Sequence, residues 1–215
     1  MSRSILVIGE SGAGKTTSLR TLDPAKTFIL DADRKGLSWR GWRKQYNVEN
    51  KNYFATSKPS IIENMMKRVN DEFLNVEVLV IDGLSTIMTD DEVERMKEKG
   101  YDRWISLAQC IWNMVSYAPL MRDDLTVIFI GHTQTESDDS GYKFIRLKTS
   151  GRKLDKITVE SKFTTVLLAK NIDGKYVFDT QADHSTAKSP MECFEKTIPN
   201  DMAFVVETLK KYEEE

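Results

Sequence analysis

Cysteine is scarce in this sequence, and no long apolar run interrupts it. The two cysteines, Cys110 and Cys193, lie far apart and outside any metal-ligand spacing. This excludes a disulfide scaffold and predicts a reducing, cytoplasmic location. The apolar runs are far shorter than the ~20 residues that a membrane helix needs. We therefore expect neither a signal peptide nor a membrane span, and no membrane partner.

Excess charge and flexible linkers are missing as well. Lysine and arginine total 31 against 33 aspartates and glutamates, for a net charge of −2. That balance excludes a protein that coats nucleic acid through bulk positive charge. No repeat and no Pro-, Gly- or Ser-rich segment divides the 215 residues, and we expect one domain over residues 1–215.

What the sequence does contain is an alternation of buried-strand and helix patterns. Short β-branched runs predict strands at residues 4–8, 27–30, 78–81, 126–130 and 164–169. Helical patterns lie between them, at about 15–22, 60–74, 89–99 and 103–117, and a last helix, capped by Asn200, is expected at about 200–211. The turn at 171–174 predicts a hairpin that ends near residue 178. This order indicates an α/β fold with a mostly parallel central sheet.

One motif between the first strand and the first helix is highly specific. It reads Gly9-Glu10-Ser11-Gly12-Ala13-Gly14-Lys15-Thr16 and fits G-x-x-x-x-G-K-[ST], with Thr17 following. The glycines let successive backbone N–H groups surround phosphate oxygens. Lys15 is expected on the β- and γ-phosphates, and the Thr16 hydroxyl on Mg²⁺. A glycine-rich turn with a surface lysine is the simpler alternative, but the flanking strand and helix argue against it.

Polar side chains follow three further strands. Asp82 ends the strand at 78–81 and is expected to hold Mg²⁺ together with Thr16. Asp31 and Asp33 end the strand at 27–30, where a carboxylate can deprotonate the water that attacks the γ-phosphate. His132 ends the strand at 126–130 and can sense that phosphate. Each of these residues has a plainer alternative, as a carboxylate or imidazole that only closes a turn.

With these motifs the chain resembles the RecA-like P-loop ATPases over roughly residues 3–180. Residues 28–33 resemble the strand that ends in the family's catalytic glutamate, with the shorter Asp33 in its place. Residues 80–85 resemble the metal-binding strand. Residues 129–134 resemble the sensor strand, with His132 where glutamine is usual and Gln134 two residues on. The departure at His132 predicts pH-dependent sensing.

The order of elements, with Gly151-Arg152-Lys153 before a strand, is most similar to small phage-encoded nucleotide-binding proteins linked to single-strand annealing and recombination. The resemblance implies a RecA-like core with a C-terminal antiparallel hairpin. It also implies the cofactors ATP and Mg²⁺, a host cytoplasmic location, and assembly into a homo-oligomeric ring or filament. A neighbouring subunit would then supply a cation in trans, for which Lys170 and Lys175 are the candidates.

Two segments are candidate surfaces for single-stranded DNA. The first interleaves rings and cations at Trp39, Arg40, Trp42 and Arg43, which suits stacking on bases. The alternative is that both tryptophans pack against the core. The second is the polar stretch 133–150, expected to be a mobile loop that offers Lys143, Arg146 and Lys148, or else to be merely solvated.

The leading prediction is an ATP-binding, ATP-hydrolysing recombination protein that acts on single-stranded DNA as an oligomer. A small-molecule or nucleotide kinase and an ATP-switched loader or regulator with slow hydrolysis are the alternatives. In RecA-like proteins the strand at 126–130 lies between the phosphate-loop strand and the Asp82 strand, whereas in kinases those two strands are adjacent.

Overall fold

A single mixed sheet organises the molecule. The computed structural model describes residues 1–95, 102–149 and 158–214, with the backbone alone for 102–108. Within that part, nine strands form a sheet with the order β3-β2-β4-β5-β1-β7-β8-β9, and β6 pairs with β5 outside this order. The strands are β1 (Arg3–Gly9), β2 (Thr27–Asp31), β3 (Tyr53–Ala55), β4 (Val78–Asp82), β5 (Thr126–Ser137), β6 (Lys143–Leu147), β7 (Thr165–Ile172), β8 (Lys175–Asp179) and β9 (Thr197–Pro199).

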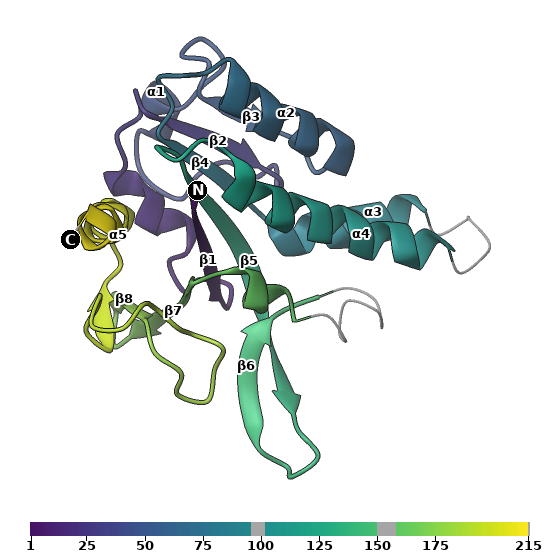
Figure 1. Ribbon diagram of the computed structural model, residues 1–215, viewed down its shortest axis with the longest axis vertical. Helices are drawn as coiled ribbons and strands as arrows, with labels where there is room; N and C mark the ends of the chain where they lie inside the picture. Colours follow the sequence, from purple (N-terminus) through teal and green to yellow (C-terminus); the bar gives the residue numbers. More distant parts are fainter. Residues whose placement is uncertain (96–101, 150–157, 215) are drawn as a thin grey trace.

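Helices cover both faces of the sheet (Figure 1). The helical segments are η1 (Thr16–Thr21), α1 (Trp42–Gln45), α2 (Pro59–Asp71), α3 (Leu84–Glu94), α4 (Asp102–Tyr117), η2 (Ala118–Leu120), η3 (Val159–Lys162) and α5 (Met202–Glu214). Because successive strand residues face opposite sides, Leu6 packs with α2, α3 and α4, while Ile5 packs with η1 and α5. The central strands are therefore buried on both faces, as their continuous apolar runs predict.

The strand order confirms the central prediction about topology. β5 lies between β1 and β4 and is parallel to both. β3, β2, β4, β5, β1 and β7 run parallel, and β8 returns antiparallel to β7 as the predicted hairpin. The fold is therefore an α/β P-loop fold with a mostly parallel sheet and a C-terminal antiparallel hairpin. The short strands β3 and β9 were not predicted.

The expectation of a mobile loop at 133–150 is wrong over its described part. β5 continues to Ser137 and pairs antiparallel with β6, so the segment is a β-hairpin that projects from the sheet (Figure 1). The Asp138 carboxylate closes its turn by accepting the N–H groups of Ser140 and Tyr142, both at 2.9 Å. A polar composition hid the strand because both faces of the outer hairpin meet solvent.

Three helix predictions also need correction. The helix expected at 15–22 is the 3₁₀ helix η1, where the Ser18 hydroxyl donates to the Lys15 carbonyl at 2.6 Å and competes with regular helix bonding. The helix expected from residue 89 already begins at Leu84, directly after β4. The cap of α5 is Asp201 instead of Asn200, because the Asp201 carboxylate accepts the Phe204 N–H at 3.0 Å. No helix in the described ranges is long and apolar enough to cross a bilayer.

Candidate functional site

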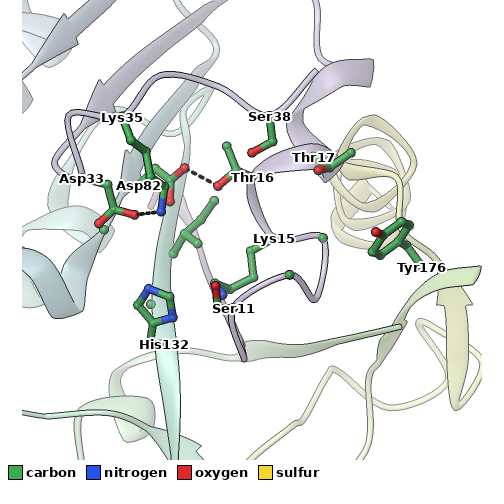
Figure 2. Close-up of a pocket in the computed structure, with 15 residues that line it drawn as sticks. Ser11, Lys15, Thr16, Thr17, Asp33, Lys35, Ser38, Asp82, His132 and Tyr176 are labelled. Carbon is green, nitrogen blue, oxygen red and sulfur yellow. Dashed lines mark hydrogen bonds and ion pairs between the residues drawn. The ribbon is translucent and has the colours of Figure 1, made fainter. Parts of the chain in front are cut away.

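A cavity of about 490 Å³ opens at the carboxyl ends of β1, β4 and β5 (Figure 2). This is the sheet edge at which parallel α/β folds bind ligands. Its volume falls in the range of small-molecule sites. The residues that line it are Ser11, Gly12, Gly14, Lys15, Thr16, Thr17, Asp33, Lys35, Ser38, Asp82, Gly83, Ile130, Gly131, His132 and Tyr176. Of the predicted loop residues, Gly9, Glu10 and Ala13 do not line the cavity.

Lys15 is held inside the loop that precedes it. Its side chain is buried, and its Nζ donates to the carbonyl oxygens of Gly9 and Glu10 at 2.8 and 2.7 Å. Burial lowers the pKa of Lys15 to about 8, against the opposing effect of the nearby Asp82 carboxylate. Lys15 is therefore a cation at neutral pH. Within the described residues its ammonium group donates to two backbone carbonyls, and phosphate oxygens can replace these acceptors.

Thr16 and Asp82 form an oxygen pair on the opposite wall. The Thr16 hydroxyl donates to the Asp82 carboxylate at 2.7 Å, and Asp82 is 4% exposed. Burial raises the pKa of Asp82 to about 6, the Thr16 hydrogen bond opposes this, and the charges of Asp33 and Asp31 add to it. A hydroxyl and a buried carboxylate are the hard oxygen ligands that Mg²⁺ takes beside a triphosphate. These residues therefore fit the ion that the sequence predicts.

The structure shows that Asp31 and Asp33, either of which could activate water according to the sequence, have different positions. Asp31 is buried, and its carboxylate accepts the Arg34 N–H at 2.9 Å, the Gly36 N–H at 2.8 Å and the Tyr53 hydroxyl at 2.7 Å. Asp33 lines the cavity instead. Asp31 therefore shapes the turn, and Asp33 is the carboxylate that a ligand in the cavity can reach.

Asp33 has two side-chain donors, Lys35 and Thr86. Burial alone would raise the pKa of Asp33, but these hydrogen bonds outweigh it and hold the pKa below its ordinary value. Gly83 makes room for this carboxylate: at its φ of +109° a Cβ would lie 2.7 Å from an Asp33 oxygen. Asp33 is thus an ionised carboxylate at neutral pH, placed by the turn after β4.

His132 lies at the cavity end of β5 (Figure 2). Its backbone N–H donates to the Ser85 hydroxyl at 3.0 Å. Burial, and then the charge of Lys15, lower the pKa of the imidazole below its ordinary value. At neutral pH the ring is therefore uncharged and suited to one donated and one accepted hydrogen bond.

A comparison of the sequence with known protein families agrees with a phosphate-binding site. A family model described as an AAA domain matches residues 1–190, most of the chain. The chain belongs to this AAA-domain family. The family indicates a P-loop, nucleotide-binding ATPase, and such ATPases in general use ATP and Mg²⁺. No curated protein matches the chain.

Six residues that line the cavity of this AAA domain were not predicted from sequence, and three of them have polar or aromatic side chains. Lys35 lies within the turn after β2, Ser38 follows that turn, and Tyr176 comes from β8, far along the chain. The Tyr176 ring lies against the phosphate loop: a Cβ on Gly14, whose φ is +90°, would meet it at 2.7 Å. A single aromatic residue in a strand belongs to no recognisable sequence motif. The position of Tyr176 beside the phosphate loop therefore becomes apparent only from the pairing of β8 with β7 in the structure.

The residues around α1 that were predicted to bind DNA differ in their exposure in the AAA domain. Trp39 and Trp42 are partly buried and pack with the core, Trp39 edge-on to Tyr46 at 5.9 Å and Trp42 against Tyr53 at 5.3 Å. Arg40 and Arg43 are exposed. The Arg43 guanidinium lies 4.8 Å from the Trp42 ring centroid. The tryptophan rings thus serve packing, and the two arginines are the accessible groups.

The remaining cations predicted to bind DNA or to act in trans also differ in their exposure and ion pairing. Arg146 is 5% exposed and pairs with Glu136 at 3.1 Å and Glu160 at 3.4 Å, which makes it unsuited to DNA contact. Lys143 and Lys148 are exposed on the hairpin. Lys170 pairs with Asp179 at 2.6 Å, whereas Lys175 is exposed at the start of β8. The motif at 151–153 lies outside the described residues.

Proposed function

We propose that this chain binds ATP with Mg²⁺, hydrolyses it, and uses that cycle to act on single-stranded DNA as a homo-oligomeric recombination protein. The observation that carries the ATPase part is the meeting of Lys15, Thr16, Asp82 and Asp33 in one cavity. These four side chains come from three separate strand ends. The recombination part rests on the RecA-like resemblance of the sequence.

The cavity supplies the groups that phosphoryl transfer to water requires. Lys15 binds the β- and γ-phosphates. Thr16 and Asp82 hold Mg²⁺, which neutralises phosphate charge when bound. The ionised Asp33 carboxylate accepts a proton from the attacking water, and the uncharged His132 ring hydrogen-bonds the γ-phosphate. Catalysis of this kind is mostly positioning and charge stabilisation.

The strand order favours an ATPase over the kinase alternative. β5 separates β1 from β4, and Asp33 after β2 and His132 on β5 line the same cavity as the phosphate loop, where they could contact an attacking water. A kinase would set β1 beside β4 and would need an acceptor pocket there. The ring of Tyr176 beside Gly14 offers a face for the nucleotide base.

Exposed cations support the DNA proposal. Arg40 and Arg43 lie on the turn before and within α1. Lys143 begins β6 on the projecting hairpin, and Lys148 directly follows β6 at the base of that hairpin. In a ring or filament such surfaces would gather from several subunits and would concentrate positive charge locally, although each chain has a net charge of −2. Lys175 is the better placed of the two candidates for a trans cation, because Lys170 is already paired with Asp179.

ATP turnover measured against added single-stranded DNA, with mass determined in parallel, tests the proposal. We expect turnover that requires Mg²⁺, rises with DNA and accompanies a mass of several chains. The charge reversals Lys143→Glu and Lys148→Glu should reduce DNA stimulation, whereas the matched control Lys211→Glu on α5 should not. Turnover indifferent to DNA in a monomer, with phosphate passing to a small acceptor, would establish a kinase instead. Binding with negligible turnover at all DNA concentrations would establish a regulator.

A further inference from the structure

Lys35 is a second lysine in the phosphate cavity, outside the phosphate-loop motif. It follows β2 by four residues and lines the cavity with Lys15, Thr16 and Asp82. Its neighbours in the chain point elsewhere: the Arg34 guanidinium pairs with Asp90 at 2.7 Å on the surface. The turn thus sends one of two consecutive cations inward and the other outward.

The turn that presents Lys35 is built by a buried carboxylate. Asp31 accepts the backbone N–H of Arg34 and of Gly36, the residues on either side of Lys35. Arg34 adopts a φ of +54°, a left-handed conformation that non-glycine residues rarely take. Two backbone N–H groups of this strained turn donate to the carboxylate of Asp31, which is 1% exposed, and this fixes the position of the Lys35 backbone.

The ammonium group of Lys35 lies among the charges of the site. It pairs with Asp33, and in Figure 2 it lies between the carboxylates of Asp33 and Asp82. Its side chain is 57% exposed, so it is free to change partners by rotating its long chain. Lys15 and Lys35 are near enough for the charge of Lys35 to contribute to the low pKa of Lys15.

We propose that Lys35 is a catalytic residue that binds the γ-phosphoryl group from within the same chain. The inference rests on the proposed ATPase function and names the cation that completes it. When the γ-phosphate occupies the cavity, Lys35 exchanges its Asp33 partner for a γ-phosphate oxygen. The same exchange frees Asp33 for the attacking water, so one movement supplies both charge stabilisation and the base.

The reaction then balances without a further reagent. The water oxygen forms a bond to the γ-phosphorus while the bond from that phosphorus to the bridging oxygen of ADP breaks. Asp33 takes one water proton and returns it to solvent after inorganic phosphate leaves. Lys35 stays protonated throughout and stabilises the charge that spreads over the phosphoryl oxygens.

Steady-state ATP turnover and equilibrium ATP binding of Lys35→Ala, Lys35→Arg and Arg34→Gln test the proposal. Arg34→Gln removes one positive charge from the same turn without touching the cavity, so it is the matched control. We expect Lys35→Ala to lower kcat roughly 100-fold to 1,000-fold, the loss typical for one transition-state donor, and to change ATP affinity by about threefold or less. Lys35→Arg should recover about tenfold or more, and Arg34→Gln should behave as wild type.

Three outcomes would overturn the proposal. The first is a kcat in Lys35→Ala equal to or above that of wild type, which would mean that the ion pair of Lys35 with Asp33 does not assist hydrolysis or inhibits it. The second is a parallel loss of ATP binding and kcat in both Lys35 variants, which would make the lysine structural. The third is an equal loss in Arg34→Gln, which would make the effect one of general charge. A wild type that binds no ATP would instead refute the proposed function itself, and the inference with it.

Discussion

The buried carboxylate of Asp82 should reduce the stability of the folded protein at neutral pH. Its environment raises its pKa from 3.8 to about 6, chiefly through burial, at 4% exposure. Because the pKa is higher in the folded state than in the unfolded state, ionisation of Asp82 lowers the free energy of unfolding. Asp82→Asn keeps an oxygen acceptor for the Thr16 hydroxyl while removing the charge. The variant should therefore be more stable than wild type.

The magnitude follows from the shift in pKa. A difference of about two pH units between the unfolded and folded values corresponds to about 3 kcal/mol. For a chain of this length, that is a rise in Tm of about 6–12 °C. The sign fixes the pH window: the penalty in wild type is fully present above pH about 6 and vanishes below pH about 4. The advantage of Asp82→Asn should therefore be largest at pH 7 and nearly absent at pH 4.

Urea denaturation followed by tryptophan fluorescence at pH 7 and pH 4, in a chelating buffer, measures this difference. Asp33→Asn is the matched control with the opposite sign. The pKa of Asp33 lies below its ordinary value, so that carboxylate stabilises the fold at pH 7 and its loss should destabilise it. An Asp82→Asn variant that is less stable than wild type at pH 7, or whose advantage is the same at both pH values, would contradict this prediction.

Three further predictions concern ATP. Asp33→Asn should retain ATP binding and lower kcat roughly 100-fold, measured by phosphate release; an unchanged rate would remove Asp33 from the mechanism. Because the pKa of Lys15 is lowered to about 8, ATP affinity should fall by up to about tenfold per pH unit above pH 8, with proton uptake on binding. Calorimetry in two buffers of different ionisation enthalpy measures that uptake, and none at pH 9 would refute the assignment. Tyr176→Ala should weaken ATP binding by roughly 5-fold to 100-fold, whereas Tyr176→Phe should bind like wild type; equal binding by all three proteins would exclude stacking.

The sequence predicted the sheet and the phosphate loop because both depend on local patterns. Buried parallel strands have continuous apolar runs, and the residues after them, such as Asp82 and His132, must meet at one sheet edge. The position of β5 between β1 and β4 was expected only from the resemblance to RecA-like ATPases. The site residues that belong to a local sequence motif, such as the phosphate loop, could therefore be predicted from the sequence.

Residues whose role depends on the direction of a side chain were not predictable. Asp31 and Asp33 follow the same strand two residues apart, and only the hydrogen bonds to the backbone of the turn show that Asp31 builds it. Lys35 belongs by sequence to a basic, tryptophan-containing run, but the turn directs it into the cavity. Arg146 reads as a loop cation, yet the pairing of β6 with β5 and the ion pair with Glu160 bury it.

Equilibrium binding of a non-hydrolysable ATP analogue with Mg²⁺, compared between wild type and Lys15→Ala, tests the central assignment most directly. The account predicts one site per chain in wild type and an affinity roughly 100-fold weaker in Lys15→Ala, since the variant loses a charge-assisted contact to phosphate. Equal micromolar affinity in both proteins, or no binding to a folded wild type, would contradict it.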